Sequence, residues 1–124
     1  MSTRDVIDEY YKLASSGDWS SWLKLFAPDL VMDEQMAGHV EGRQVLEKLI
    51  SAFPKVYQSF RNAPFYTVID GEEAAVFSHI SAVLANGDPV EVDAANYFVI
   101  ANERISYMSN VHDTVPFKSV PAHE

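Results

Sequence analysis

The sequence contains no cysteine, so it can form no disulfide, no thiolate nucleophile and no zinc–thiolate site. It also lacks a run of about 18 apolar residues, the length that a membrane-spanning helix needs. The first residues, Met-Ser-Thr-Arg-Asp, contain no apolar stretch of the kind that makes a signal peptide. These absences favour a reducing compartment, and we expect the protein to be cytoplasmic.

Basic residues are scarce, with 9 Lys and Arg against 18 Asp and Glu, which gives a formal net charge of −9. This excess of negative charge disfavours nucleic acid and anionic membrane surfaces as partners. The sequence also has no Gly-rich phosphate loop, no Gly-x-Ser-x-Gly and no His-Glu-x-x-His. We therefore predict no metal and no cofactor, and we expect a small molecule as ligand or substrate.

The chain has 124 residues, of which 48% are hydrophobic and 12% aromatic. These values are typical of one folded domain with a single core and one pocket, and we expect residues 1–124 to form it. In the first half, Ser2 and Asp5 have the spacing of a capping box ahead of an apolar stripe. Helix signals of this kind predict three helices, over residues 2–17, 18–27 and 43–53, the last of them stopped by Pro54.

The second half alternates apolar and polar residues with the period of a strand. Asn86-Gly87 is a strong hairpin signal. After a short strand over residues 30–34, four longer strands are predicted, over residues 63–69, 74–85, 89–101 and 104–112. Three helices followed by an antiparallel meander make an α+β fold, with the helices over one face of the sheet. A strongly curved sheet closed by helices forms a cone, and its open end is a ligand site.

Asn96 is the one polar side chain on an otherwise apolar inward face of the strand over residues 89–101. A buried amide without a partner costs about 1–3 kcal/mol, so Asn96 has either a structural partner or a ligand to bind. On the next strand Met108, Asn110 and His112 share a face. Polar groups that converge inside a small sheet predict a pocket.

The order of these elements resembles the nuclear transport factor 2-like superfamily, especially its SnoaL-like polyketide cyclase and ketosteroid isomerase branches. The segments that match are residues 10–18, 26–34, 40–43, 86–96 and 104–113. The resemblance implies a cone-shaped curved antiparallel sheet with three N-terminal helices that enclose a pocket, the nuclear transport factor 2-like or cystatin-like fold. It does not imply one function, because this fold carries isomerases, cyclases, dehydratases, epoxide hydrolases and non-catalytic domains.

The resemblance also implies site residues. Tyr10 stands where steroid-isomerase-like relatives donate a hydrogen bond to the substrate oxyanion, although a tyrosine here is equally compatible with the core. The proton-shuttling carboxylate falls at Glu34, or at Asp33 if the match slips by one residue; only one of the two can face the pocket. An apolar wall would raise the pKa of that carboxyl toward working pH. Asn96 takes the place of the protonated aspartic acid that assists the oxyanion, and its amide is a permanent donor.

Asn110 occupies the position of the acid/base aspartate of SnoaL-like cyclases, and an amide cannot carry a proton. The usual cyclase route is therefore in doubt, and His112, on the same face, could replace the aspartate. The hairpin at residues 86–96 matches the family, and the match, continued into the strand before it, implies that the face of His79 and Phe77 lines the pocket. A lone histidine in such a place is often structural. His39 and His123 are predicted to lie at the surface. Ligand-binding side chains are expected at Trp22, Phe53, Phe77, Phe98, Met108 and Asn110, which favours a flat apolar or aromatic ligand.

These residues predict a cofactor-free acid/base enzyme of isomerase, dehydratase or polyketide cyclase type, acting on a small apolar oxygenated molecule. The candidate catalytic residues are Tyr10, Asp33, Glu34, His79, Asn96 and His112. The alternative is a non-catalytic small-ligand-binding or dimerisation domain, which the lack of aspartate at positions 96 and 110 favours. We also expect a homodimer through the outward sheet face, where Ala95, Tyr97 and Val99 leave apolar surface.

Overall fold

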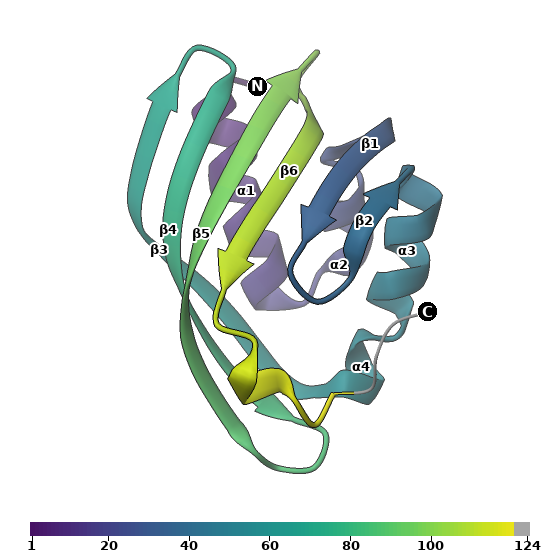
Figure 1. Cartoon of the computed structure of the whole chain (residues 1–124). Helices are drawn as coiled ribbons and strands as arrows, with labels where there is room; N and C mark the ends of the chain where they lie inside the picture. Colours follow the sequence, from purple (N-terminus) through teal and green to yellow (C-terminus); the bar gives the residue numbers. More distant parts are fainter. Residues whose placement is uncertain (121–124) are drawn as a thin grey trace.

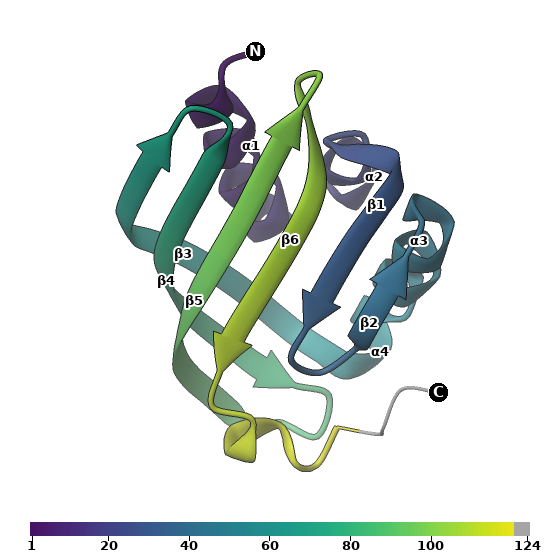
Figure 2. The same ribbon diagram turned by 45° about the horizontal axis from the view of Figure 1, so that its top comes forward.

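The computed structural model describes residues 1–120, so His123 lies outside the described residues. Helices cover one face of a curved six-stranded sheet with the strand order β2-β1-β6-β5-β4-β3 (Figures 1 and 2). All neighbouring strands run antiparallel except β1 and β6, which are parallel. The elements are α1 (Thr3–Ser16), α2 (Trp19–Leu23), β1 (Phe26–Glu34), β2 (Gly38–Glu41), α3 (Arg43–Ser51), α4 (Phe53–Val56), β3 (Tyr57–Asp70), β4 (Glu73–Leu84), β5 (Pro89–Ala101), β6 (Arg104–His112) and η1 (Val115–Phe117). The predicted α+β cone is confirmed.

The sheet is larger than the predicted four-stranded meander. β1 pairs with β6, and β2 adds a further strand at the edge beyond β1. β2 has only four residues, with Val40 as the single buried one, which is too short for a periodic signal. β3 begins at Tyr57 rather than at residue 63. Pro54 does not stop the third helix: α3 ends at Ser51, and Pro54 lies in the first turn of α4, where its missing N–H costs nothing.

Local signals fix several of the element ends. The Ser2 side chain accepts the N–H of Asp5 and the Asp5 side chain accepts that of Ser2, so the capping box at the start of α1 is confirmed. Gly17 ends α1 with a left-handed φ of 76°. Asn102 and Glu103, between β5 and β6, both have positive φ, 52° and 63°. That conformation suits the two-residue hairpin turn that brings β6 back beside β5.

Curvature of the sheet makes room for a cavity. The lower parts of β3, β4 and β5 bend away from β1 and β6 (Figure 1), and the β3–β4 pairing shifts register between Pro64 and Tyr66. An irregularity of this kind bends and twists a strand pair. One core cluster packs α1 and α2 against the sheet around Phe26 and Phe98, and a second joins the lower ends of β4 and β5 to Phe117 of η1. The cavity lies where the helices and these two clusters meet.

The alternation predicted for β5 is confirmed at every position from Val90 to Ile100: the even-numbered residues are buried and face the helices. Burying one large apolar side chain contributes about 1.5–3 kcal/mol, so this single strand holds its register firmly. Among residues 1–120, no helix is long and apolar enough to cross a membrane.

Candidate functional site

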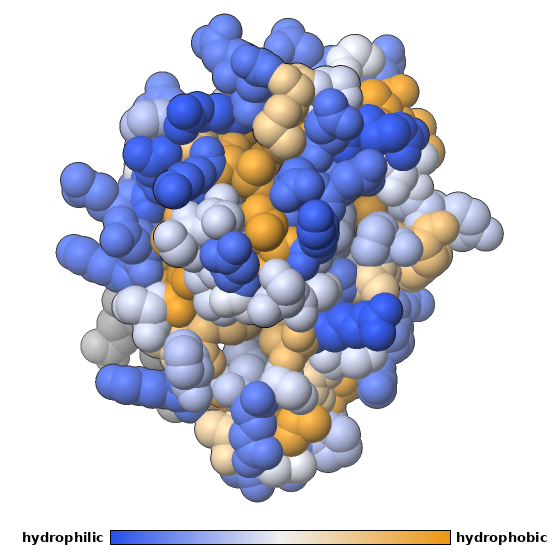
Figure 3. Space-filling model, turned by 180° about the vertical axis from the view of Figure 1, so that it is seen from behind, coloured by the Kyte–Doolittle hydropathy of each residue, from blue (hydrophilic) through white to orange (hydrophobic). Residues whose placement is uncertain are grey.

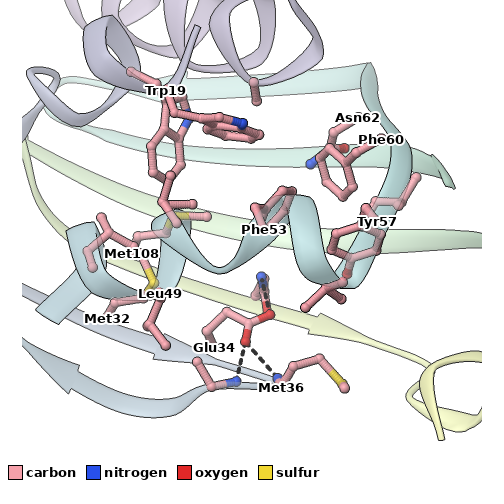
Figure 4. A pocket seen from close by; sticks show the side chains of 18 of the residues that line it. Trp19, Met32, Glu34, Met36, Leu49, Phe53, Tyr57, Phe60, Asn62 and Met108 are labelled. Carbon is pink, nitrogen blue, oxygen red and sulfur yellow. Dashed lines mark hydrogen bonds between the residues drawn. The ribbon is translucent and has the colours of Figure 1, made fainter. Parts of the chain in front are cut away.

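A cavity of about 430 Å³ lies between the helices and the inner face of the sheet. Its volume is within the range of small-molecule sites. Aromatic side chains from α2, α4 and β3 form much of its wall, among them Trp19, Phe53, Tyr57 and Phe60 (Figure 4). Polar groups reach it at only a few points, so each is a candidate for recognition or chemistry.

One polar group of the wall is the cluster of Glu34, Asn110 and His112. The parallel pairing of β1 with β6 places Asp33 opposite Ser109, which brings the next residues of both strands together. Glu34 Oε2 accepts the backbone N–H of Met36 at 2.7 Å and that of Ala37 (Figure 4).

The other oxygen of Glu34 faces β6. Glu34 Oε1 lies 3.4 Å from Asn110 Nδ2 and 3.9 Å from His112 Nε2. Asn110 Oδ1 in turn accepts the N–H of Gln35 at 3.0 Å. Asn110 therefore orients the carboxylate of Glu34 and cannot itself take up or release a proton in a reaction.

Burial raises the pKa of the Glu34 carboxyl, but interactions with His112, with the N–H groups of Ala37 and Met36, and with Asn110 outweigh it. The net pKa is lower than the usual 4.5. The expectation of a carboxyl whose pKa is raised by an apolar wall is thus wrong. The physical reason is that His112, and after it the backbone donors of the turn that follows β1, stabilise the charged form. Glu34 is a carboxylate throughout the neutral range.

The His112 side chain is only 3% exposed and its ring packs 5.1 Å from that of Phe117 in η1. His112 Nδ1 lies 2.9 Å from the carbonyl oxygen of Asp113, which can only accept, so Nδ1 carries a proton. Nε2 is then the nitrogen that titrates, and it faces Glu34. The interaction with Glu34 raises the pKa of His112 above 6.5 although desolvation opposes this. Glu34 and His112 therefore form a partly buried acid/base pair.

Asp33 points away from the cavity. Its carboxylate accepts the Tyr107 hydroxyl at 2.6 Å and contacts His39 Nδ1 at 2.7 Å, both at the exposed surface. These contacts lower the pKa of the Asp33 carboxyl. The sequence left open whether Asp33 or Glu34 faces the pocket. Neighbouring residues of a strand face opposite sides, and Glu34 is the one that lines the cavity.

Asn96 is buried, with 4% of its surface exposed, and it borders the cavity. Asn96 Nδ2 donates to the carbonyl oxygen of Val76 at 3.1 Å and to Ser78 Oγ at 2.9 Å. The Val76 carbonyl accepts only, so the amide nitrogen must be on that side, and both of its protons have partners. Asn96 can offer a ligand only its oxygen. The expected donor role toward an oxyanion is therefore wrong, and the structural partner explains why Asn96 is buried.

Tyr10 reaches the cavity from α1. It is 7% exposed, and its ring packs 5.0 Å from that of Phe98 and 5.5 Å from that of Trp22. Burial raises the pKa of Tyr10 well above 10, so its hydroxyl stays protonated. Tyr10 is thus available as a neutral donor.

His79 and Phe77 lie on the outer face of the sheet, contrary to expectation. The buried residues of β4 are the even-numbered ones from Ala74 to Leu84. His79 instead contacts Asp93 and Glu91, which lie beside it on β5. The prediction failed because it followed the hairpin match rather than the pattern of β4, whose inward face is apolar except for the fully buried Ser78.

Of the other expected ligand contacts, Trp22, Phe53, Met108 and Asn110 line the cavity. Phe98 has no exposed surface and lies behind Tyr10, in the core. The sequence reasoning missed Asn62, which lines the cavity from β3. It was missed because this strand was expected to begin at residue 63, just after Asn62, whereas β3 begins at Tyr57. The spacing of Phe60 and Asn62 by two was the available signal.

Comparison with known proteins identifies the family. The profile of the SnoaL-like domain matches residues 7–108. The chain belongs to the SnoaL-like domain family. No curated protein matches its sequence.

Solved structures similar to this SnoaL-like domain have the same fold at low sequence identity. A nuclear transport factor 2-like protein of unknown function from Burkholderia pseudomallei has a TM-score of 0.85 and 19% identity, with 93% of each chain covered. A candidate polyketide cyclase from Pseudomonas putida has a TM-score of 0.81 and 18% identity, with 94% of this chain and 96% of that chain covered. TerC, co-crystallised with polyporic acid, has a TM-score of 0.82 and 19% identity over 93% of this chain and 94% of its own.

Proposed function

We propose that this SnoaL-like domain catalyses cofactor-free proton transfer on a small, apolar, oxygenated molecule, in a reaction of isomerase, dehydratase or polyketide cyclase type. The observation that carries the proposal is the partly buried pair of Glu34 and His112 in the wall of a mainly apolar cavity. Groups with perturbed pKa values that share a cavity are typical of active sites. The similar structures of a candidate polyketide cyclase and of TerC with polyporic acid support a cavity of this kind.

His112 Nε2 is the proposed proton-transfer group, because the raised pKa of His112 makes its neutral form a stronger base, whereas the lowered pKa of Glu34 makes that carboxylate a weaker one. In the first step, neutral Nε2 takes a proton from a carbon next to a substrate carbonyl. The C–H electron pair moves into the enolate, whose oxygen accepts a hydrogen bond from the Tyr10 hydroxyl. Glu34 stabilises the imidazolium that forms.

The second step returns the proton and decides the reaction type. Protonation of a different carbon completes an isomerisation. Protonation of a β-hydroxyl, which leaves as water while the enolate electrons form the double bond, completes a dehydration. Attack of the enolate carbon on a second carbonyl, whose oxygen takes the proton, completes a cyclisation. All three require the same two groups, a proton carrier and an oxyanion donor.

A non-catalytic binding domain is the second candidate. It is favoured by Asn96, whose amide protons are used inside the fold, and by Asn110, which cannot carry a proton. Under this hypothesis the same cavity holds a ligand that is not converted.

The deciding experiment follows the exchange of carbon-bound hydrogen for deuterium in a panel of cyclic and aryl ketones in D2O by NMR. We expect wild-type protein, dialysed against EDTA, to catalyse the exchange for at least one ketone. The double variant Glu34→Gln/His112→Gln is expected to lose it by at least 10²-fold. A panel that binds but never exchanges faster with protein than without would favour the binding domain.

We also propose a homodimer through the outer sheet face. Tyr66, Phe77, Ala95 and Val111 are neighbours across four strands, and Phe77, Tyr66 and Val111 are exposed. A row of exposed apolar groups of this length suits an interface. Tyr97→Asp on this face should convert a dimer into a folded monomer in sedimentation velocity at tens of micromolar. A wild-type monomer at that concentration would contradict the proposal.

Three further expectations remain proposals. They are a single domain over residues 1–124, a cytoplasmic location, and the absence of nucleic acid, membrane and cofactor from the set of partners. Seen from the side opposite to that of Figure 1, the surface is largely hydrophilic, with hydrophobic side chains showing between hydrophilic ones (Figure 3).

A further inference from the structure

Tyr57, the first residue of β3, is turned toward the cavity by an irregularity of the strand. Tyr57 pairs with Leu84 of β4, but Ser59 already pairs with Val83, so β3 holds one residue more than β4 over this stretch. An extra residue of this kind is a β-bulge, which re-aims the side chains beside it. Tyr57 therefore shares the inner side with Phe60 in spite of the odd spacing between them, and both residues line the cavity.

The ring of Tyr57 is held by two other aromatic rings. Its centroid lies 4.7 Å from that of Phe53 in α4 and 5.3 Å from that of Phe60. In Figure 4 Tyr57 lies beside Phe60, and Phe53 separates both from Trp19. Side-chain packing of this kind fixes the direction of a polar group without a hydrogen bond. The Tyr57 hydroxyl is thus placed by the apolar wall around it.

The Tyr57 hydroxyl has no hydrogen-bond partner within residues 1–120. Burial raises the pKa of Tyr57 to about 12, and the nearby charge of Glu34 adds to this, so the hydroxyl lies out of bulk water and stays protonated at neutral pH. Some buried polar atoms of residues 1–120 are closed off by the fold without a partner, but the Tyr57 hydroxyl is not one of them. A desolvated and unpaired hydroxyl that opens into a cavity lacks a partner that a ligand can supply.

Tyr57 and Tyr10 stand at the two ends of a row of aromatic rings in the cavity wall. Tyr10 contacts the ring of Trp22, and Phe53 contacts that of Tyr57. Trp19 joins the two halves, 5.2 Å from Trp22 and 4.8 Å from Phe53. The two tyrosine hydroxyls are therefore separated by an apolar surface, which suits a ligand with an apolar frame between two polar ends.

We propose that Tyr57 is a specificity residue, whose hydroxyl donates a hydrogen bond to a second acceptor oxygen of the ligand on the α4 side of the cavity. Tyr10 is the proposed donor to the first oxygen, the one that becomes the enolate. The ligand class is then a dicarbonyl compound on an apolar or aromatic frame. This inference rests on the proposed function for the role of Tyr10 and for a ligand in the cavity, but it does not require turnover.

The test measures binding of aryl ketones by isothermal titration calorimetry. The probes are acetophenone and acetylnaphthalene with their diacetyl derivatives, so that the second carbonyl samples several positions on each frame. We expect wild-type protein to bind at least one diketone about 5–10-fold more tightly than its monoketone parent, as one neutral hydrogen bond supplies. Tyr57→Phe should abolish this gain. It should leave the monoketone within about twofold of its wild-type affinity, because the Tyr10 hydroxyl is still present.

Tyr11→Phe is the matched control, because it removes the same group from a neighbouring environment. The Tyr11 hydroxyl is also buried without a partner, but it is closed off, and Tyr11 does not line the cavity. This variant should keep the diketone gain. Thermal unfolding adds a second measurement: Tyr57→Phe should have a Tm equal to that of wild type or slightly higher, because the hydroxyl that it loses has no partner in the fold.

Four results would overturn the inference. They are a diketone gain that survives in Tyr57→Phe, a gain that Tyr11→Phe loses as well, no gain in wild-type protein, and a Tm of Tyr57→Phe several degrees below that of wild type. In each case monoketones can still bind and exchange deuterium, so the proposed function stands.

The two proposals can also fail in other combinations. A diketone gain that depends on Tyr57, without deuterium exchange in any ketone, would support this inference and favour the binding domain over the enzyme. If no ketone binds at all, the cavity is not a site for carbonyl compounds, and the proposed function fails together with this inference.

Discussion

The two faces of the sheet carry the same pair of side-chain types in opposite surroundings. On the inner face, His112 Nε2 lies 3.9 Å from Glu34 Oε1, and the histidine side chain is 3% exposed. On the outer face, His79 lies 2.8 Å from Asp93 Oδ1 and 2.5 Å from Glu91 Oε2, with 41% of its side chain exposed. The shorter contacts are therefore those of the solvent-exposed His79 cluster.

The facing carboxylates raise the pKa of both histidines, Glu34 that of His112, and Asp93 with Glu91 that of His79. Water screens the outer cluster, and exposed ion pairs of this kind contribute little. The inner pair interacts through a medium of lower dielectric constant and can touch a ligand. Burial and access to a cavity, rather than a short distance, therefore mark the histidine suited to chemistry.

The largest effect should separate the two histidines by turnover. His112→Gln is expected to lower kcat/KM by about 10²–10⁴-fold, because it removes the proton carrier. His79→Gln, the matched change on the outer face, should stay within about twofold of wild type, since its side chain reaches no cavity residue. Steady-state rates on a ketone identified by deuterium exchange measure both. Equal losses in the two variants would show that access to the cavity does not distinguish His112 from His79.

The second effect concerns the pH dependence of the reaction. Neutral His112 is the proposed base, so activity should rise with pH through the raised pKa of His112. Glu34→Gln removes the main cause of that shift, and the rising limb of kcat/KM should move to lower pH. Asp33→Asn, the control one residue away on the outward side, should leave the limb in place. A limb that does not move in Glu34→Gln would assign the titration to another group.

The third effect is on stability. The pKa of His112 is raised in the folded protein, so its contribution is complete below 6.5 and disappears as pH rises through the raised value. The pKa of Glu34 is lowered, so its contribution is complete above 4.5 and disappears as pH falls through the lowered value. The difference in unfolding free energy between wild type and Glu34→Gln/His112→Gln should therefore be greatest between pH 4.5 and 6.5. Urea titrations across this range measure it, and a difference that is flat with pH would contradict the pairing.

The smallest effect belongs to the outer cluster. His79→Gln should shift the urea midpoint at pH 6 only slightly, because exposed ion pairs contribute little, and 1 M NaCl should reduce the shift further. The contribution of the inner pair should persist in the same salt. A salt-resistant contribution from His79 would show that the outer cluster is covered in solution, as a dimer through that face would cover it.

Much of this architecture follows from local signals in the sequence. The capping box of Ser2 and Asp5, the turn at Asn86-Gly87 and the alternation along β5 each depend on neighbouring residues, so each was predictable. The same parity placed Asn110 and His112 together on β6, and the strand rule required that only one of Asp33 and Glu34 face inward. Candidate residues on two strands of the cavity wall could thus be named without a structure.

What only the tertiary structure decided depends on partners distant in the sequence. The hairpin match placed the His79 face of β4 toward the pocket; the folded chain buries the even-numbered residues of β4 instead, and the register with β5 sets His79 beside Asp93 on the outer face. The carbonyl of Val76, twenty positions before Asn96, takes the amide proton that seemed free for a ligand. His112 and the backbone N–H groups after β1 stabilise the charged form of Glu34, so its pKa is lowered where a raised one was expected. The sequence determined which residues share a face, because side-chain direction is local; it could not determine which polar groups are already satisfied, because hydrogen-bond partners are chosen by the folded chain.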